Sequence, residues 1–416
     1  MQRLYAGPHA GRSALKRALV GSLSSRPRRA LAALAAAVLP GLLLDCSSAS
    51  ESAAPADGGD AGDELAPVIA DSGTEMEADV VTGPREIPTS LSGFGLFTGG
   101  PDAKGRLTPV AGTIPYELTS VLFSDYALKA RTLTIPPGSK ATYRPEGVLD
   151  FPVGTILSKT FAFPADSRQP EVGVRLIETR ILVHQPSGWE AYPYLWNDEQ
   201  TEATLVPGGR VLPVSFVDPK GDARSFDYLV PSRNQCQQCH HLVDENGAQL
   251  LGPIGPKARY LNRNNVIAGT DQNQLTYLAN AGLLDGLPGS PPRAPDAFDP
   301  ASGDLESRAR AYLDINCAHC HNTHGTAGIT SRLFLQHDTT DRFSLGVCKR
   351  PGSAGGSLGG EFDILPGDHA RSILWHRIDT TESGKMMPQI GRALAHVEGS
   401  QLIADWIDAM PAETCQ

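Results

Sequence analysis

The chain has 416 residues, of which 40% are hydrophobic and 20% are charged, and its net charge is −10. This length accommodates two or three domains with buried cores, and the apolar content excludes a chain that is disordered throughout. The negative charge argues against nucleic-acid binding and is compatible with basic protein partners.

The first 46 residues have the pattern of a secretory signal peptide. Residues 1–29 carry seven Lys and Arg residues and no acid, and residues 30–44 form an apolar run too short to span a bilayer comfortably. We therefore expect an exported protein of a Gram-negative bacterium, anchored in the periplasm or outer membrane by a lipid on Cys46. Because Asp45 replaces the small residue usual before a lipidated cysteine, cleavage after residues 47–49 without an anchor is the alternative.

Residues 47–87 have the composition of a disordered acidic linker. Between residues 47 and 82 there are nine Asp and Glu residues, no Lys or Arg, and few large apolar side chains. Such a segment buries too little apolar surface to offset the entropy lost on ordering, so we expect an extended tether.

Residues 88–232 predict an antiparallel β-sandwich or barrel. The expected strands are 128–135, 155–163, 172–184, 189–196, 203–205, 211–217 and 225–229, and turn signals such as Pro186-Ser187-Gly188 separate them. We interpret the polar side chains of this region as solvated rather than catalytic; they include His184, Asp125, Asp198 and Glu199.

Two motifs with the pattern Cys-x-x-Cys-His carry the chemistry. CQQCH occupies residues 236–240 and CAHCH occupies residues 317–321. Two thiols three positions apart can each form a thioether with a haem vinyl group, and the adjacent histidine can bind the iron. The motifs predict two covalently bound haem c groups, held by Cys236, Cys239 and His240 and by Cys317, Cys320 and His321.

A zinc site is the competing interpretation, because a repeated Cys-x-x-Cys is also typical of zinc ribbons. However, the 77 residues between Cys239 and Cys317 are more than a ribbon needs, and zinc requires no histidine after each cysteine pair. Disulfides within the motifs are a third alternative. Export places the thiols where haem attachment occurs, which favours the haem interpretation.

Helical patterns surround the second motif. Residues 305–315 form an amphipathic segment that leads into Cys317, and residues 399–409 form another. Over residues 301–416 the chain resembles c-type cytochromes of the Met/His class, through Ala311-Tyr312-Leu313, CAHCH, Met387-Pro388 and the segment around Trp406. From about Leu118 it also resembles a family of exported bacterial proteins that join a β-rich half to cytochrome c segments; the matching motifs include Leu122-Phe123-Ser124-Asp125-Tyr126-Ala127, Glu178-Thr179-Arg180, CQQCH and Leu251-Gly252-Pro253.

These features predict an α+β multidomain protein. We expect the β-sandwich or barrel of residues 88–232 to be followed by mainly α cytochrome c-like haem domains. The first haem-binding segment would occupy residues 233–300, and the second cytochrome c-like domain residues 301–416.

The resemblance also implies the second iron ligand of one haem. In Met/His cytochromes c this ligand is a thioether on an irregular loop, commonly just before a proline. Met387 precedes Pro388, 70 residues after Cys317, and is the expected ligand opposite His321. Met386 is the alternative, as is a methionine pair that merely fills a core gap.

The haem at CQQCH has no such ligand in the sequence. There is no methionine between His240 and Met386, and His241 would point about 100° away from His240 on a helix. The second coordination position of this iron is either open or filled by another side chain. The candidates are Lys257, Tyr260, His184, His324, His337, His369, His376 and His396. We interpret His319, within the second motif, as a surface residue.

Two cysteines lie in the C-terminal part outside the motifs. In an oxidising compartment, Cys348 and Cys415 predict a disulfide that ties the Cys348 loop to the C-terminus, with free thiols as the alternative.

The leading functional prediction is an exported di-haem c-type cytochrome that transfers electrons between redox partner proteins, as a carrier rather than a catalyst. It contacts a membrane only through the N-terminal anchor. The first alternative is a di-haem peroxidase-like or other oxidoreductase that uses an open first haem. The second is a ligand-binding module with peripheral haems. Coordination at His240 discriminates between these functions.

Overall fold

The computed structural model describes residues 83–244, 246–352 and 358–416. All described residues belong to one compact unit. The expected signal peptide, Cys46 and nearly all of the expected linker therefore lie outside the described residues. Within the described ranges, no helix is both long and apolar enough to cross a membrane.

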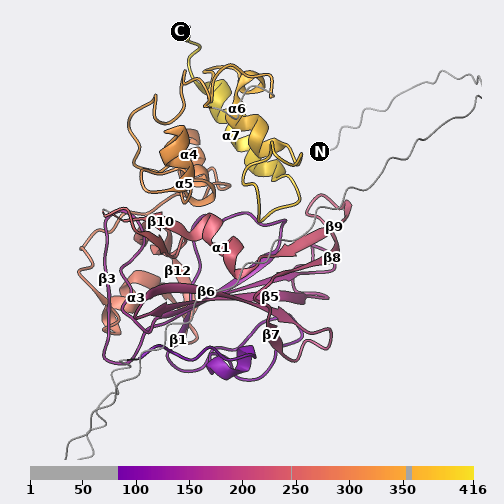
Figure 1. The fold of residues 1–416 in the computed structure, drawn as a ribbon, viewed down its shortest axis with the longest axis vertical. Helices are drawn as coiled ribbons and strands as arrows, with labels where there is room; N and C mark the ends of the chain where they lie inside the picture. The colour runs from indigo at the N-terminus through magenta and orange to yellow at the C-terminus, as the bar shows by residue number, and fades with distance from the viewer. Residues whose placement is uncertain (1–82, 245, 353–357) are drawn as a thin grey trace, which may run out of the picture. The chain divides into compact units, whose positions relative to one another are not determined.

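An antiparallel six-stranded sheet forms the centre of this unit (Figure 1). Its strands follow the order β1-β2-β4-β5-β6-β7, and neighbours in the chain are mostly neighbours in the sheet. Their bounds are β1 Thr113–Pro115, β2 Leu128–Thr134, β4 Ile156–Phe163, β5 Arg175–Gln185, β6 Gly188–Trp196 and β7 Ala203–Leu205. These segments are rich in β-branched and aromatic residues, which favour strands. Gly188, with φ 115°, permits the tight turn between β5 and β6.

Both faces of this sheet are covered. On one face, Ile156, Ile181 and Tyr194 pack with Leu91 and Phe94 of the 3-10 helix η1 (Leu91–Phe94). On the other, strand residues pack with the hairpin of β8 (Arg210–Val217) and β9 (Ala223–Val230), through side chains such as Phe163, Phe216 and Tyr228. The hairpin forms a separate two-stranded sheet.

Residues 233–300 form short elements around the sheet. They are α1 Arg233–His240, β10 His241–Val243, β11 Gln249–Leu251, α2 Ala258–Leu261, β12 Asn264–Ile267, β13 Thr270–Asn273, α3 Gln274–Asn280 and β14 Leu284–Asp285, which pairs in parallel with β3 (Ala141–Thr142). Their apolar side chains, among them Tyr260 and Leu275, share one core with Leu133 and Leu157 of the sheet. This segment completes the β core rather than forming a separate helical domain.

The C-terminal segment contains α4 Leu305–Asn316, α5 Thr326–Ser331, η2 His369–Arg371, α6 Ile373–Asp379 and α7 Val397–Ala409. Helices α4, α6 and α7 share a core with loop residues such as Leu335 and Ile364. A Cβ atom at Gly399 would lie 2.3 Å from the hydroxyl of Tyr312, so this glycine allows the close approach of α7 to α4. A disulfide joins Cys348 to Cys415, with Cα atoms 5.0 Å apart, as the sequence predicts.

The predicted fold class is wrong. The described residues form mainly antiparallel strands and loops, the helices are small, and no mainly α cytochrome-like domain occurs among them. Helices α4 and α7 do form where the amphipathic patterns lie. The rest of the C-terminal segment is largely irregular, because glycine and proline interrupt helices. The segment after CQQCH forms hairpins in place of helices.

Candidate functional site

The CAHCH motif follows directly from helix α4. Asp304 caps this helix by accepting a hydrogen bond from the Ser307 backbone N–H at 2.7 Å, and the helix ends at Asn316, one residue before Cys317. The backbone then turns, with the N–H of His321 donating to the Cys317 carbonyl at 2.9 Å. This turn places both cysteines and the histidine of the motif at one cavity.

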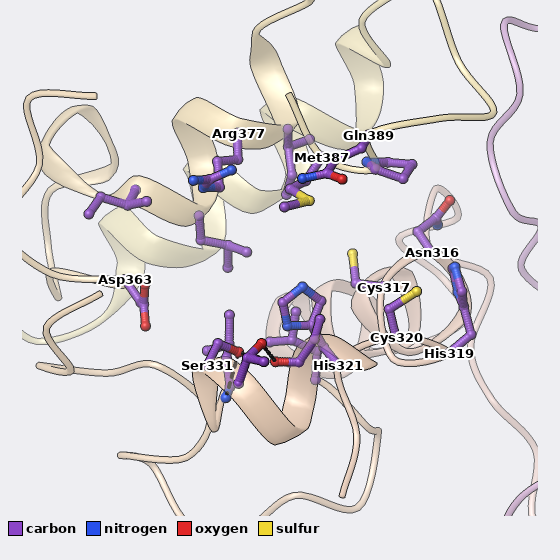
Figure 2. A pocket seen from close by; sticks show the side chains of 18 of the residues that line it. Asn316, Cys317, His319, Cys320, His321, Ser331, Asp363, Arg377, Met387 and Gln389 are labelled. Atoms are coloured by element: carbon purple, nitrogen blue, oxygen red, sulfur yellow. Dashed lines mark hydrogen bonds between the residues drawn. The ribbon is translucent and has the colours of Figure 1, made fainter. Parts of the chain in front are cut away.

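That cavity has a volume of about 420 Å³ and is lined by residues of CAHCH and of the loop after α6 (Figure 2). Figure 2 shows Met387 on the wall opposite His321, with Cys317 and Cys320 at one end. Much of the remaining lining is apolar: Leu333, Leu335, Ile373, Leu374, Ile378 and Ile390. Met387 lines this cavity and Met386 does not. The volume of the cavity lies within the usual range for ligand pockets, about 300–1,000 Å³.

The His321 side chain is half-buried, and its surroundings favour the neutral imidazole. Burial lowers its pKa from 6.5 to about 4, and the nearby Leu333 backbone acts in the opposite direction. Its Nδ1 atom is buried and makes no hydrogen bond with the described residues. A neutral imidazole is the form that binds transition metals, so this side chain is ready to act as a ligand.

The loop that carries Met387 is held in place by buried polar groups. The N–H of Met387 donates to the Arg377 carbonyl at 2.8 Å, and the Arg392 guanidinium donates to the carbonyls of Met387, Arg377, Thr380 and Leu394. Asp125 accepts the backbone N–H groups of Ala393 and Leu394, both at 2.7 Å. These contacts fix the path of the chain on either side of Pro388.

The CQQCH motif lies on helix α1, which packs beside β6 (Figure 1). Ser232 and Gln235 form a capping box at its start. At its end, His240 places Nδ1 2.7 Å from the Gly252 carbonyl, and burial lowers its pKa to about 4. With Nδ1 bonded to a carbonyl, Nε2 is the nitrogen left to act as an acceptor or a metal ligand.

A second cavity, of about 150 Å³, is lined by Cys236, Cys239 and His240. This volume lies below the usual range for ligand pockets, so a porphyrin at His240 requires the lining to move. Among the candidate partners considered for His240, His396 contributes to the lining. It stacks on Phe123, with ring centroids 4.0 Å apart, and places Nδ1 3.2 Å from the Tyr312 hydroxyl.

The remaining candidates are engaged elsewhere and are not part of the described lining. Lys257 forms a buried ion pair with Asp314 at 2.9 Å, and Tyr260 donates to the same carboxylate at 2.7 Å. His184 stacks on Trp189. His337 and His369 contact Asp338 and Asp408, His376 contacts the Ala370 carbonyl, and the carbonyl of His324 accepts a backbone hydrogen bond from Val243.

The two motifs lie next to each other. The Cys320 thiol donates to the Gln238 carbonyl at 3.4 Å, and hydrogen bonds from Cys320 and His319 lower the pKa of Cys239. Residues such as Cys239, Cys317, His319 and Met387 line both cavities. Among the described residues, no group of three or more Cys, His, Asp or Glu side chains could hold a metal ion.

Three features of the site differ from the sequence interpretation or were missed. Asp125, interpreted as solvated, is only 3% exposed and binds the loop after Met387. His319, interpreted as a surface residue, has a buried Nδ1 and lines both cavities. Arg392 was not singled out. A pattern read along the chain does not reveal contacts between residues more than 200 positions apart, such as those of Asp125 with Ala393 and Leu394.

Comparisons of the chain with protein-family models, curated proteins and solved structures find no match.

Proposed function

We propose that this protein is an exported electron carrier with two covalently attached haem c groups, one at each Cys-x-x-Cys-His motif. The observation that carries the proposal is the arrangement of the CAHCH cavity in Figure 2: Met387 lies opposite His321, and Cys317 and Cys320 lie at one end. These four side chains supply two thiols, an imidazole and a thioether, which is the complete donor set of a Met/His haem c.

The residues at CAHCH fit such a group. Addition of each thiol S–H across one vinyl C=C bond forms a thioether and needs no oxidant or reductant. When bound, the haem iron accepts and releases one electron. The apolar lining would exclude water, and Arg392 and Asp125 would hold the methionine loop at a fixed position.

The residues at CQQCH meet only part of what a covalently attached haem requires. Cys236, Cys239 and His240 provide the attachment groups, while the smaller cavity and the absence of a thioether of its own make this site different. Because Cys239 and Cys320 contact each other, attached groups would lie close together, which favours electron exchange between them. Redox proteins are the partners in this proposal, with no role for nucleic acid.

The test is production of the full chain in a bacterium that attaches haem c. We expect a mass increase of two haems, retention of both after boiling in detergent, and a c-type pyridine haemochrome band. Cys317→Ala/Cys320→Ala should carry one haem, and Cys236→Ala/Cys239→Ala should carry the other. Haem lost on boiling, or a b-type band, would contradict covalent attachment. Binding of cyanide to the oxidised protein, or of CO to the reduced protein, would instead support the peroxidase-like alternative.

A further inference from the structure

Three cationic side chains lie side by side on one face of the central sheet. Arg131 of β2 pairs in register with Lys159 of β4, and Lys159 pairs with Arg180 of β5. Residues paired in register point to the same face, so these side chains form a row, here called the cationic row. All three line the cavity that contains His240.

The row lies between two apolar regions of the same face. Two residues along the strands, Leu133, Leu157 and Leu182 form the next row, and they belong to or pack on the core shared with α2 and α3. In the other direction, Phe161 belongs to the core shared with β8 and β9. Like charges directly opposite each other destabilise a sheet, and burial increases the cost, so this arrangement calls for compensating negative charge.

The described residues supply only part of that charge. Glu117 pairs with Arg131 at 3.0 Å, and the fully buried Glu178 pairs with Arg180. The Arg131 side chain is 4% exposed, yet its Nη2 atom is buried without a hydrogen bond among the described residues. Lys159 forms no ion pair with the described residues and lies over the Phe161 ring at 4.7 Å, where Arg180 also packs at 4.4 Å.

We propose that the cationic row is a binding site for a carboxylate in the cavity of His240, centred on Lys159 and the free Nη2 of Arg131. Two sources share this chemistry. One is a propionate of a haem attached at CQQCH, and this source rests on the proposed function. The other is a small free carboxylate. Burial, together with the neighbouring cations, lowers the pKa of Lys159, and a bound anion would act in the opposite direction.

The experiment uses the purified full chain with its attached groups and two readouts. Sodium acetate is titrated by calorimetry, and the midpoint potentials are measured by redox titration. The variants are Lys159→Met, the charge-conserving Lys159→Arg, and Lys140→Met as a control, because Lys140 is an exposed lysine that does not line the cavity.

If a propionate occupies the row, acetate does not bind saturably, and Lys159→Met lowers one midpoint potential. Loss of a nearby positive charge favours the oxidised and more positive state. Lys159→Arg and Lys140→Met should leave that potential close to the wild-type value. If a free carboxylate is the ligand, the wild-type chain binds acetate, and Lys159→Met weakens binding about tenfold or more.

A chain with attached haem that shows neither acetate binding nor a selective change of potential in Lys159→Met overturns the carboxylate site and leaves the proposed function standing. A chain without haem contradicts the proposed function. In that case acetate binding decides alone: saturable binding lost in Lys159→Met supports the site, and no binding overturns it.

Discussion

The imidazoles of His321 and His240 show how burial prepares single residues for metal binding. Both lie in surroundings that lower their pKa to about 4, so each is neutral near neutral pH. The two differ in their cavities. His321 lies opposite Met387, whereas the cavity of His240 is also lined by the cationic row and His396. Identical five-residue patterns therefore lead to different sites.

Replacement of Met387 by alanine tests the proposed iron ligand. We expect Met387→Ala to abolish the weak sulfur-to-iron absorption band at roughly 695 nm and to lower the potential of that haem, because a thioether raises it. Met386→Ala is the matched control, since Met386 does not line the cavity. Retention of the band in Met387→Ala and its loss in Met386→Ala would reverse the assignment.

His396 makes stability depend on pH. Burial lowers its pKa from 6.5 to about 3, so below pH 6.5 the unfolded chain binds a proton that the folded chain excludes. Stability from this group is present at neutral pH and falls as pH drops, by about 2 kcal/mol between about pH 7 and pH 5. Urea unfolding should show a weaker pH dependence in His396→Gln. His376→Gln, at a half-exposed position, should keep the wild-type dependence.

At the scale of elements, α4 and α7 build the frame of the CAHCH cavity. Helix α4 positions Cys317, and α7 packs on it where Gly399 meets the Tyr312 ring. The same ring lies near His396, at the start of α7, with centroids 5.5 Å apart. The packing of these two helices therefore connects the motif to the lining of the second cavity.

Gly399→Ala should disturb this helix pair. The added methyl group would overlap the Tyr312 hydroxyl and ring carbons, which lie within 2.6 Å of its position, so α7 must shift. We expect a loss of about 1–3 kcal/mol of stability in denaturant unfolding. Gln401→Ala, at an exposed position of α7, is the control and should change stability little. Equal stability of the two variants would argue against close packing at Gly399.

At the scale of the whole described unit, long-range links hold the C-terminal segment together and against the sheet. The Cys348–Cys415 disulfide spans 67 residues, and Asp125, beside β2, binds the loop that carries Met387. Both links connect regions that are distant in the sequence.

Removal of the disulfide should destabilise the protein. A cross-link across a loop of this length restricts the unfolded chain, so Cys348→Ser/Cys415→Ser should lose about 2–4 kcal/mol in thermal or denaturant unfolding. Mass analysis without reductant provides the control, because the wild-type chain should show both thiols blocked. Two free thiols in the exported protein would contradict the bond.

The sequence by itself determined the local features of this protein. The strands of the central sheet and the helices α4 and α7 form close to where side-chain periodicity placed them, because these patterns depend on neighbours a few residues apart. Spacing and residue type likewise singled out CAHCH and Met387, whose side chains line one cavity.

Only the tertiary structure decided how these features combine. Sequence patterns suggested separate helical domains, whereas residues 233–300 complete a β core. Nor could they show that Cys239 meets Cys320, that Asp125 binds the Met387 loop, or that Arg131, Lys159 and Arg180 align on one face. These contacts arise from strand register and from packing between distant segments, which local periodicity does not encode.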